Sequence, residues 1–133
     1  MERAKNLKFF IVDDDPFCRN FYRQHLINLG FKNSVVFENG YDCIEKLDLL
    51  PDIIFLDYDM KPYNGIEVMQ IIQQYDPRIH LLIISSQKNN DVISEAKKYG
   101  AYDYIQKGEN DLQLISNVIS EIQMNRRLQK ANA

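Results

Sequence analysis

The chain has 133 residues, of which 45% are hydrophobic and 26% are charged, and its formal net charge at pH 7 is -3. This length and apolar content suit one domain with a full core, and the acidic balance argues against a nucleic-acid-binding surface. Because no apolar run is long enough to cross a membrane or to act as a signal peptide, we expect a cytoplasmic domain without membrane association. Cys18 and Cys43 lack a metal-binding spacing, which predicts free thiols in a reducing compartment.

Five short apolar runs are expected to form strands, and a helical pattern follows each of them. The predicted order is strand 7–12, helix 16–29, strand 34–37, helix 42–50, strand 52–56, helix 65–75, strand 80–84, helix 91–99, strand 102–106 and helix 111–128. The first, third and fourth runs are almost continuously apolar, which is typical of strands covered on both faces. This alternation predicts an α/β fold in which a doubly wound, five-stranded parallel sheet carries helices on both faces.

Local signals place several helix ends. Asp15 precedes Pro16, and an acidic N-cap before proline at the first helical position is a favoured start. Gly30 and Gly100 are well placed to end helices. The last helix should turn five apolar residues inward, namely Leu112, Ile115, Val118, Ile119 and Ile122. We expect the domain to span residues 1–126, with 127–133 as a polar tail or the start of a linker.

Polar side chains stand at the ends of four of the five predicted strands. They are Asp13, Asp14 and Asp15 after the first strand, Asp57 after the third, Ser85 and Ser86 after the fourth, and Lys107 near the end of the fifth. Open parallel sheets bind ligands at the carboxyl ends of their strands. Any one of these residues alone would be an ordinary cap or surface residue, but their joint placement predicts a site.

Asp15 is the expected cap. The other three acids, Asp13, Asp14 and Asp57, carry like charges and need a cation beside them. Magnesium is the natural candidate, because it prefers hard oxygen ligands and uses few carboxylates. Lys107 supplies a second positive charge, directed at an anion. A carboxylate, Mg²⁺, a hydroxyl and a lysine together suit phosphoryl acceptance, in which the carboxylate attacks and the other groups hold the phosphoryl oxygens.

Four motifs together resemble the receiver domain of two-component response regulators, and the similarity covers nearly the whole chain. IVDDDP carries the acidic pair of that family, and FLDYDMKPYNG resembles the phosphoacceptor segment with Asp57 as the acceptor. LLIISSQ places Ser85 at the Ser/Thr position of the family. GAYDYIQK places Tyr104 at the switch aromatic and Lys107 at the lysine.

The resemblance implies a flavodoxin-like (βα)5 fold similar to that of chemotaxis regulators, with strand order 2-1-3-4-5. It implies a phosphoprotein rather than an enzyme, whose aspartyl phosphate forms on Asp57. A sensor histidine kinase, or a phosphotransfer protein of a phosphorelay, would donate the phosphoryl group. The resemblance also implies that Mg²⁺ is held by the Asp14 and Asp57 carboxylates and the backbone carbonyl of Asp59, with Asp13 acting through water.

The family's response to phosphorylation is implied as well. The phosphoryl group would draw Ser85 inward, and Tyr104 would turn into the vacated space. The altered face, around the fourth helix, the fifth strand and the fifth helix, would then bind a downstream protein or a second copy of the domain. Direct nucleic-acid binding by this domain is not expected.

Two positions depart from the family pattern. Lys61 stands where the family has proline, which comes one residue later at Pro62, and Gly108 stands where proline follows the lysine. The chemistry is expected to survive both changes, which bear on the shape and rigidity of the two loops.

Two alternative functions are compatible with parts of the sequence. Asp57-Tyr58-Asp59 resembles the nucleophile motif of haloacid-dehalogenase-like phosphatases, although that class has its nucleophile strand first and its acidic pair last. A degenerate receiver would act only as a binding module, but every phosphorylation residue is present here. A long-lived adduct with a small phosphodonor would indicate a receiver, rapid turnover a phosphatase, and no adduct a degenerate module.

Overall fold

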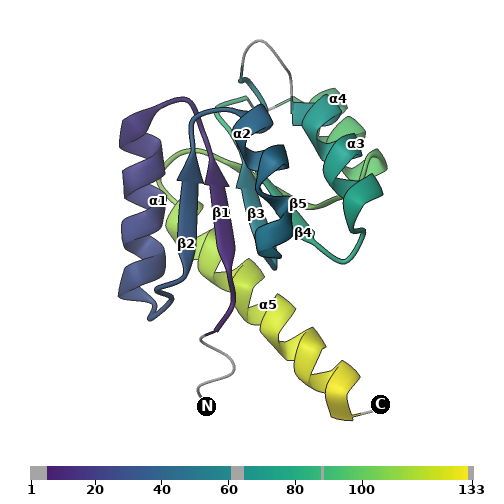
Figure 1. Cartoon of the computed structure of the whole chain (residues 1–133). Coiled ribbons are helices and arrows are strands. Elements are labelled where there is room, and N and C mark those ends of the chain that lie inside the picture. The colour runs from purple at the N-terminus through teal and green to yellow at the C-terminus, as the bar shows by residue number, and fades with distance from the viewer. Residues whose placement is uncertain (1–5, 61–64, 88, 132–133) are drawn as a thin grey trace.

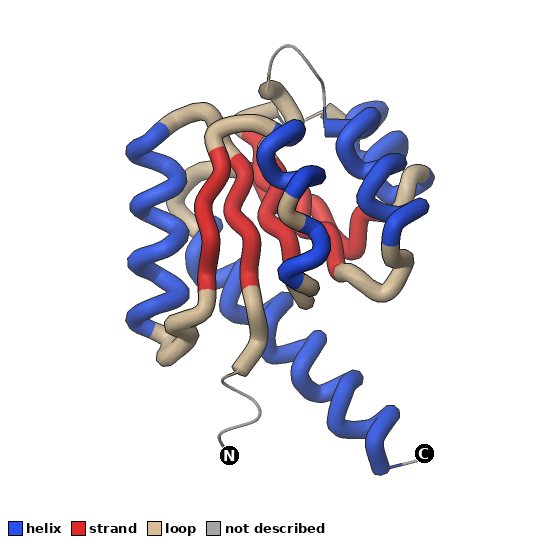
Figure 2. The backbone as a smooth tube through the Cα atoms, in the orientation of Figure 1, coloured by secondary structure: helices blue, strands red, loops and turns tan. Residues whose placement is uncertain are grey.

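The computed structural model describes residues 6–60, 65–87 and 89–131, which form a parallel sheet with helices on both faces. Its strands are β1 (Phe9–Val12), β2 (Ser34–Phe37), β3 (Ile53–Leu56), β4 (His80–Ser85) and β5 (Ala101–Gln106). All neighbouring strands are parallel, and their order is β2-β1-β3-β4-β5. The predicted fold class and strand order are therefore confirmed. Figure 2 shows the strands as a middle layer between the helices.

The helices form two outer layers. They are α1 (Pro16–Asn28), α2 (Gly40–Glu45), α3 (Gly65–Tyr75), α4 (Asn90–Lys98) and α5 (Asp111–Ala131), with a short 3-10 helix, η2 (Leu47–Leu49), after α2. Helices α1 and α5 lie on one face of the sheet, whereas α2, α3 and α4 lie on the other (Figure 1). No helix in the described part of the chain is both long and apolar enough to span a membrane.

Strand β1 shows why the central strands are apolar along their whole length. Successive side chains of a strand point to opposite faces. Phe9 and Ile11 pack with residues of α1 and α5, while Phe10 and Val12 pack with residues of α2 and α3. All four residues are buried. The sheet therefore has a core on each face, as the near-continuous apolar runs predicted.

Helix α1 begins where the sequence predicts and ends at Asn28, one residue before the predicted end. The Asp15 side chain accepts a hydrogen bond from the backbone N–H of Phe17 at 2.9 Å, and Pro16 occupies the first turn. Gly30 follows the helix with a φ of 97°, a left-handed conformation that favours glycine, and its N–H donates to the carbonyl of Ile27. The prediction of Asp15 as an N-cap is confirmed.

The region expected as one helix over 42–50 is instead divided, so that prediction is wrong in its bounds. Asn39 caps the N–H of Asp42 at 2.9 Å, and α2 consequently starts at Gly40. The chain then tightens into η2, which ends at Leu49, and Leu50 follows with a φ of 61° just before Pro51. Asparagine is a favoured N-cap residue, so Asn39 is the local signal for this start.

Helix α5 is longer than expected. It continues through residue 126, where we placed the end of the domain, and runs on to Ala131. Its C-terminal turns project past the end of the sheet (Figure 1). Ile115, Val118, Ile119 and Ile122 are buried as predicted, and Leu112 packs partly buried against them. The division of the chain at residue 126 remains a prediction.

Candidate acidic site at the carboxyl edge of the sheet

The register of β1 and β3 brings the two aspartates that follow these strands together. Val12 and Leu56 are paired across the strands, so Asp13 and Asp57 are the next residues on each. The N–H of Asp57 donates to the carbonyl of Val12 at 2.9 Å, which extends the ladder by one bond. The backbone pairing of β1 with β3 therefore fixes the position of Asp57 independently of its side-chain contacts.

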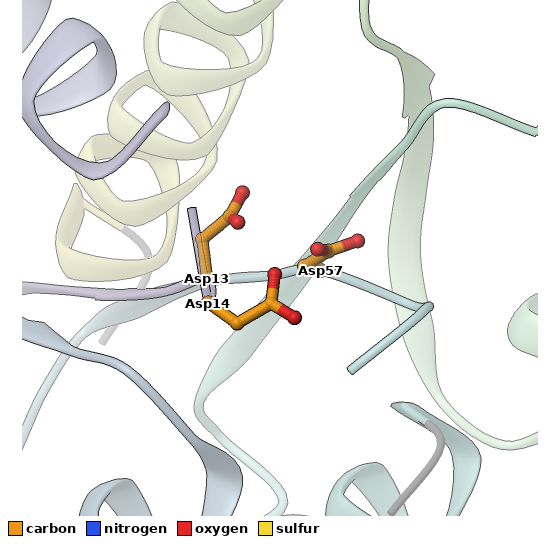
Figure 3. A group of neighbouring side chains, drawn as sticks. All are labelled: Asp13, Asp14 and Asp57. Carbon is orange, nitrogen blue, oxygen red and sulfur yellow. The ribbon is translucent and has the colours of Figure 1, made fainter. Parts of the chain in front are cut away.

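Asp13, Asp14 and Asp57 form a compact acidic cluster, as the sequence predicts. One carboxylate oxygen from each lies within 4.8 Å of those of the other two. Figure 3 shows the three side chains at the ends of the neighbouring strands, with the carboxylate of Asp14 turned toward Asp57. Asp13 and Asp57 are only 3% and 6% exposed, whereas Asp14 is exposed to solvent. Water therefore screens the charges of the two buried acids poorly.

Lys107 supplies the nearest positive charge. Its Nζ lies 2.9 Å from Asp13 Oδ2 and 3.6 Å from Asp57 Oδ2. The backbone N–H of Lys107 donates to the carbonyl of Ser85 at 2.8 Å, so the pairing of β5 with β4 positions it. Burial lowers the pKa of Lys107, but its hydrogen bond to Asp13 and the charge of Asp57 outweigh burial and raise that pKa. Lys107 is thus firmly protonated between two carboxylates.

One lysine does not fully compensate the acidic cluster. Burial, and then repulsion from Asp13, raise the pKa of Asp57 to about 6 from 3.8, although the charge of Lys107 works in the opposite direction. The ionised form of Asp57 is therefore disfavoured in the folded domain. A further cation beside Asp57 would relieve this cost.

Asp13 and Asp14 are bound differently by the protein. Asp13 Oδ1 accepts from the N–H of Asp15 at 2.9 Å, and its Oδ2 accepts from Lys107, so both of its oxygens have protein partners. Within the described residues, the carboxylate of Asp14 has no hydrogen-bond partner. Asp14 is therefore the more available ligand of the two for an added cation.

The donor set fits Mg²⁺. All of the groups in the cluster are carboxylate oxygens, the hard ligands that Mg²⁺ prefers, and the exposure of Asp14 leaves room for the waters that Mg²⁺ retains. The backbone carbonyl of Asp59 was also expected as a ligand. Asp59 lies beside the cluster, because its N–H donates to Asp57 Oδ1 at 3.2 Å.

Ser85 and Tyr104 are both connected to the segment that follows β4. Ser85 is fully buried, and its hydroxyl donates to Asp59 Oδ2 at 3.0 Å. Tyr104 is half-buried, and its hydroxyl donates to the carbonyl of Gln87 at 2.8 Å. The side chain of Gln87 in turn donates to Asp59 Oδ1 at 2.6 Å. The resemblance to receiver domains implies a role only for the backbone carbonyl of Asp59, and the sequence did not predict these contacts of its carboxylate or of Gln87.

A buried carboxylate outside the acidic cluster stabilises the loop that carries Lys107. Asp111 is 5% exposed, and its Oδ2 accepts from the Tyr22 hydroxyl at 2.7 Å and from the N–H of Gly108 at 3.3 Å. Gly108 has a φ of 155°, a conformation that favours glycine. Gly108, which stands where the family has proline, therefore lies in a loop that Asp111 stabilises by a hydrogen bond. The other departure, at Lys61 and Pro62, lies outside the described residues.

Comparisons with known proteins point to one family. Residues 9–119 match the family model of the response regulator receiver domain. The chain is 32% identical over 101 residues to the chemotaxis protein CheY of Thermotoga maritima, a match that covers 75% of this chain and 84% of that protein. It is also 33% identical over 132 residues to a protein-glutamate methylesterase/protein-glutamine glutaminase of Carboxydothermus hydrogenoformans, covering 96% of this chain but 36% of that protein.

Solved structures support the fold alone. The signal receiver domain of a putative Luxo repressor protein from Vibrio parahaemolyticus superposes with a TM-score of 0.83 at 20% identity, over 95% of this chain and 96% of that one. The beryllofluoride-activated DrrB receiver domain gives a TM-score of 0.79 at 22% identity, over 90% and 98% of the two chains.

The different surroundings of Asp14 and Asp15 generate a prediction. Asp14→Ala removes an available carboxylate, and we expect it to lower the affinity for Mg²⁺ by roughly ten-fold or more. Loss of a residue that only hydrogen-bonds to a metal ligand already has an effect of this size. Asp15→Ala removes the α1 cap and should cost about 1 kcal/mol of stability with little effect on Mg²⁺. Calorimetric Mg²⁺ titration and thermal melting measure the two effects. The reverse pattern would contradict the assignment.

Proposed function

The chain belongs to the response regulator receiver domain family, and from this premise we propose that Asp57 is the residue that accepts the phosphoryl group. A receiver domain is a signalling module rather than a catalytic enzyme, and its partner is a histidine kinase. The observation that best supports Asp57 is its position: it is nearly buried, it lies beside the Asp14 carboxylate, and Lys107 Nζ is 3.6 Å from it. The phosphatase-like alternative does not fit a chain whose acidic pair follows the first strand.

The proposed transfer is a simple displacement at phosphorus. A carboxylate oxygen of Asp57 forms the new P–O bond while the P–N bond to the donor's phosphohistidine breaks, and the imidazole leaves with the electron pair of that bond. The product is an acyl phosphate on Asp57. Lys107 already lies against Asp57, and it would hold one of the phosphoryl oxygens by a charge-assisted hydrogen bond. The Ser85 hydroxyl would hold another.

Magnesium would complete the site. The carboxylates of Asp14 and Asp57 and the backbone carbonyl of Asp59 would be its protein ligands, with Asp13 contributing through water. This assignment is supported by the hydrogen bonds that already occupy both oxygens of Asp13 and leave Asp14 available. Bound there, the ion would supply positive charge to the phosphoryl oxygens during transfer.

Phosphorylation of Asp57 is testable with a small donor. Radiolabelled acetyl phosphate with Mg²⁺ should give a long-lived adduct on the wild-type domain, and Asp57→Asn should abolish it because the nucleophilic oxygen is lost. Asp48→Asn, at an exposed position of η2, is a matched control that should be labelled normally. Undiminished labelling of Asp57→Asn would show that another residue is the acceptor. Rapid turnover would instead favour a phosphatase, and absence of any adduct a degenerate module.

The output of the domain is proposed to be a protein-binding face formed by α4, β5 and α5. Lys97 and Asp103 lie on it with Nζ and Oδ1 4.0 Å apart, so charges of both signs are present. Lys98 and Glu109 add to it, and the position of Lys88 in the sequence predicts that it belongs to the same face, although Lys88 lies outside the described residues. Mixed charge suits pairing with a second copy across a two-fold axis as well as binding of a downstream protein.

Beryllofluoride, which stands in for the phosphoryl group, tests this output. With Mg²⁺ it should raise the mass measured by light scattering, or the affinity for a partner, because it favours the state with Ser85 drawn inward. Amide exchange over residues 85–110 should change in parallel. If the ion binds and neither mass nor exchange responds, the proposed switch is absent.

A further inference from the structure

A cavity of about 710 Å³ lies at the amino edge of the sheet, at the opposite end of the strands from the acidic cluster. It is lined by Leu50–Asp52 before β3, by Asp76–His80 up to the start of β4, and by Arg126, Gln129 and Lys130 of α5. These last residues belong to the C-terminal turns of α5 that project past the sheet (Figure 1). Ligand cavities commonly have volumes of roughly 300–1,000 Å³, so this one has the size of a small-molecule site.

The two carboxylates that line the cavity are already bound by the protein. Asp52 Oδ1 accepts from Arg126 Nη1 at 2.7 Å, and its Oδ2 accepts from the backbone N–H of Lys8 at 2.8 Å. Asp76 Oδ1 accepts from the backbone N–H and the Nε of Arg78 at 2.9 and 3.0 Å, and its Oδ2 accepts from Arg78 Nη2 at 3.2 Å. Each carboxylate oxygen therefore has a donor, and neither acid is an open ligand for a cation.

The basic side chains of the cavity retain donors for a ligand. The hydrogen bond from Arg126 to Asp52 uses one N–H of a guanidinium, which carries several more. Lys130 is exposed, and its ammonium has no hydrogen-bond or ion-pair partner among the residues that the structure describes. Residues four apart on a helix lie on the same face, so Arg126 and Lys130 can bind one ligand together. The cavity has three basic and two acidic side chains, so it is locally positive on a chain whose net charge is -3.

His80 lies in the wall of the cavity beside these donors. Its ring packs edge-on against the ring of Tyr102 with centroids 5.0 Å apart, and among the described residues its buried Nδ1 has no hydrogen-bond partner. Burial, and then the charge of Arg126, lower the pKa of His80, although the charge of Asp52 works in the opposite direction. The ring is therefore uncharged at pH 7. An anion bound beside Arg126 changes the surroundings of this ring, which makes His80 a reporter of occupancy.

We propose that this cavity binds a small organic anion, whose carboxylate or phosphate group is held by Arg126 and Lys130. A guanidinium binds such groups through two parallel hydrogen bonds, and an ammonium adds charge. The side chains of Leu50, Pro51 and Ile79 provide apolar wall for the rest of the ligand. The C-terminal turns of α5 thus supply both binding groups.

The experiment is an NMR titration of the two histidine rings of the chain at pH 7, without Mg²⁺ and at constant ionic strength. Phenyl phosphate and benzoate should shift the His80 resonances saturably, and the anion that binds more tightly identifies the preferred head group. Benzyl alcohol, which keeps the apolar ring without the charge, should not bind. His25, whose Nε2 lies 2.9 Å from Ser116 Oγ between α1 and α5, is the internal control and should not shift. Because no phosphoryl transfer is involved, the result is independent of the function proposed for Asp57.

Matched variants of α5 test the two binding groups. Arg126→Met should weaken binding of the tighter anion by roughly ten-fold or more, because charge-assisted hydrogen bonds are lost. Lys130→Met leaves the pair of Arg126 and Asp52 intact and should weaken binding by about two- to five-fold. Arg127→Met removes the neighbouring exposed arginine, which does not line the cavity, and should bind like wild type.

Three results would overturn the proposed site. The first is a His80 shift with both anions that is no larger than the shift with sodium chloride at the same ionic strength. The second is equal binding of benzyl alcohol. The third is an Arg127→Met variant that binds as weakly as Lys130→Met. If Arg126→Met is unfolded at the temperature of the titration, Lys130→Met decides, and unchanged binding in that variant contradicts the proposal.

Discussion

The excess negative charge at the carboxyl edge of β1 and β3 is the constraint on which the rest of the site depends. Two carboxylates are nearly buried there, a third lies within 4.8 Å, and one lysine is shared between the buried pair. A buried charge is tolerated only when it is paired. Lys107 compensates the negative charge of Asp57 only in part. A bound cation, or a reaction that recruits a cation, would compensate that charge further. The same imbalance that costs stability supports the proposal that Asp57 is the acceptor.

The pairing of the strands brings these groups to one edge of the sheet. Pairing of Val12 with Leu56 aligns Asp13 with Asp57, and the pairing of β4 with β5 brings Lys107 beside Ser85. Cores on both faces of the sheet keep the strands in register, because a slip by one residue would expose one apolar set. The strand register therefore sets the relative positions of the groups that follow the strands.

The sequence predicted those parts of the fold that depend on local patterns. Near-continuous apolar runs located the strands, and Asp15 with Pro16 located the start of α1, because such signals act within a few residues. The start of α2 at Gly40 depends on the cap Asn39, and the division of α2 from η2 falls at Lys46, where the backbone has a φ of -110° and a ψ of 15°. The contacts of Asp59 with Ser85 and Gln87, and of Tyr22 with Asp111, join segments distant in sequence. A serine after a strand or a tyrosine in a helix carries no local signal of its partner.

The stability of metal-free wild type and Asp57→Asn across pH tests the central claim most directly. The folded pKa of Asp57, about 6, lies above the ordinary value of 3.8, so folding binds a proton more tightly and this contribution to stability is lost as pH rises from about 4 through about 6. In chelator at pH 7, Asp57→Asn should be more stable than wild type by about 1 to 3 kcal/mol, with the advantage shrinking toward pH 4. Added Mg²⁺ at pH 7 should stabilise wild type and not the variant. A wild type that is the more stable protein at pH 7 in chelator would contradict the account.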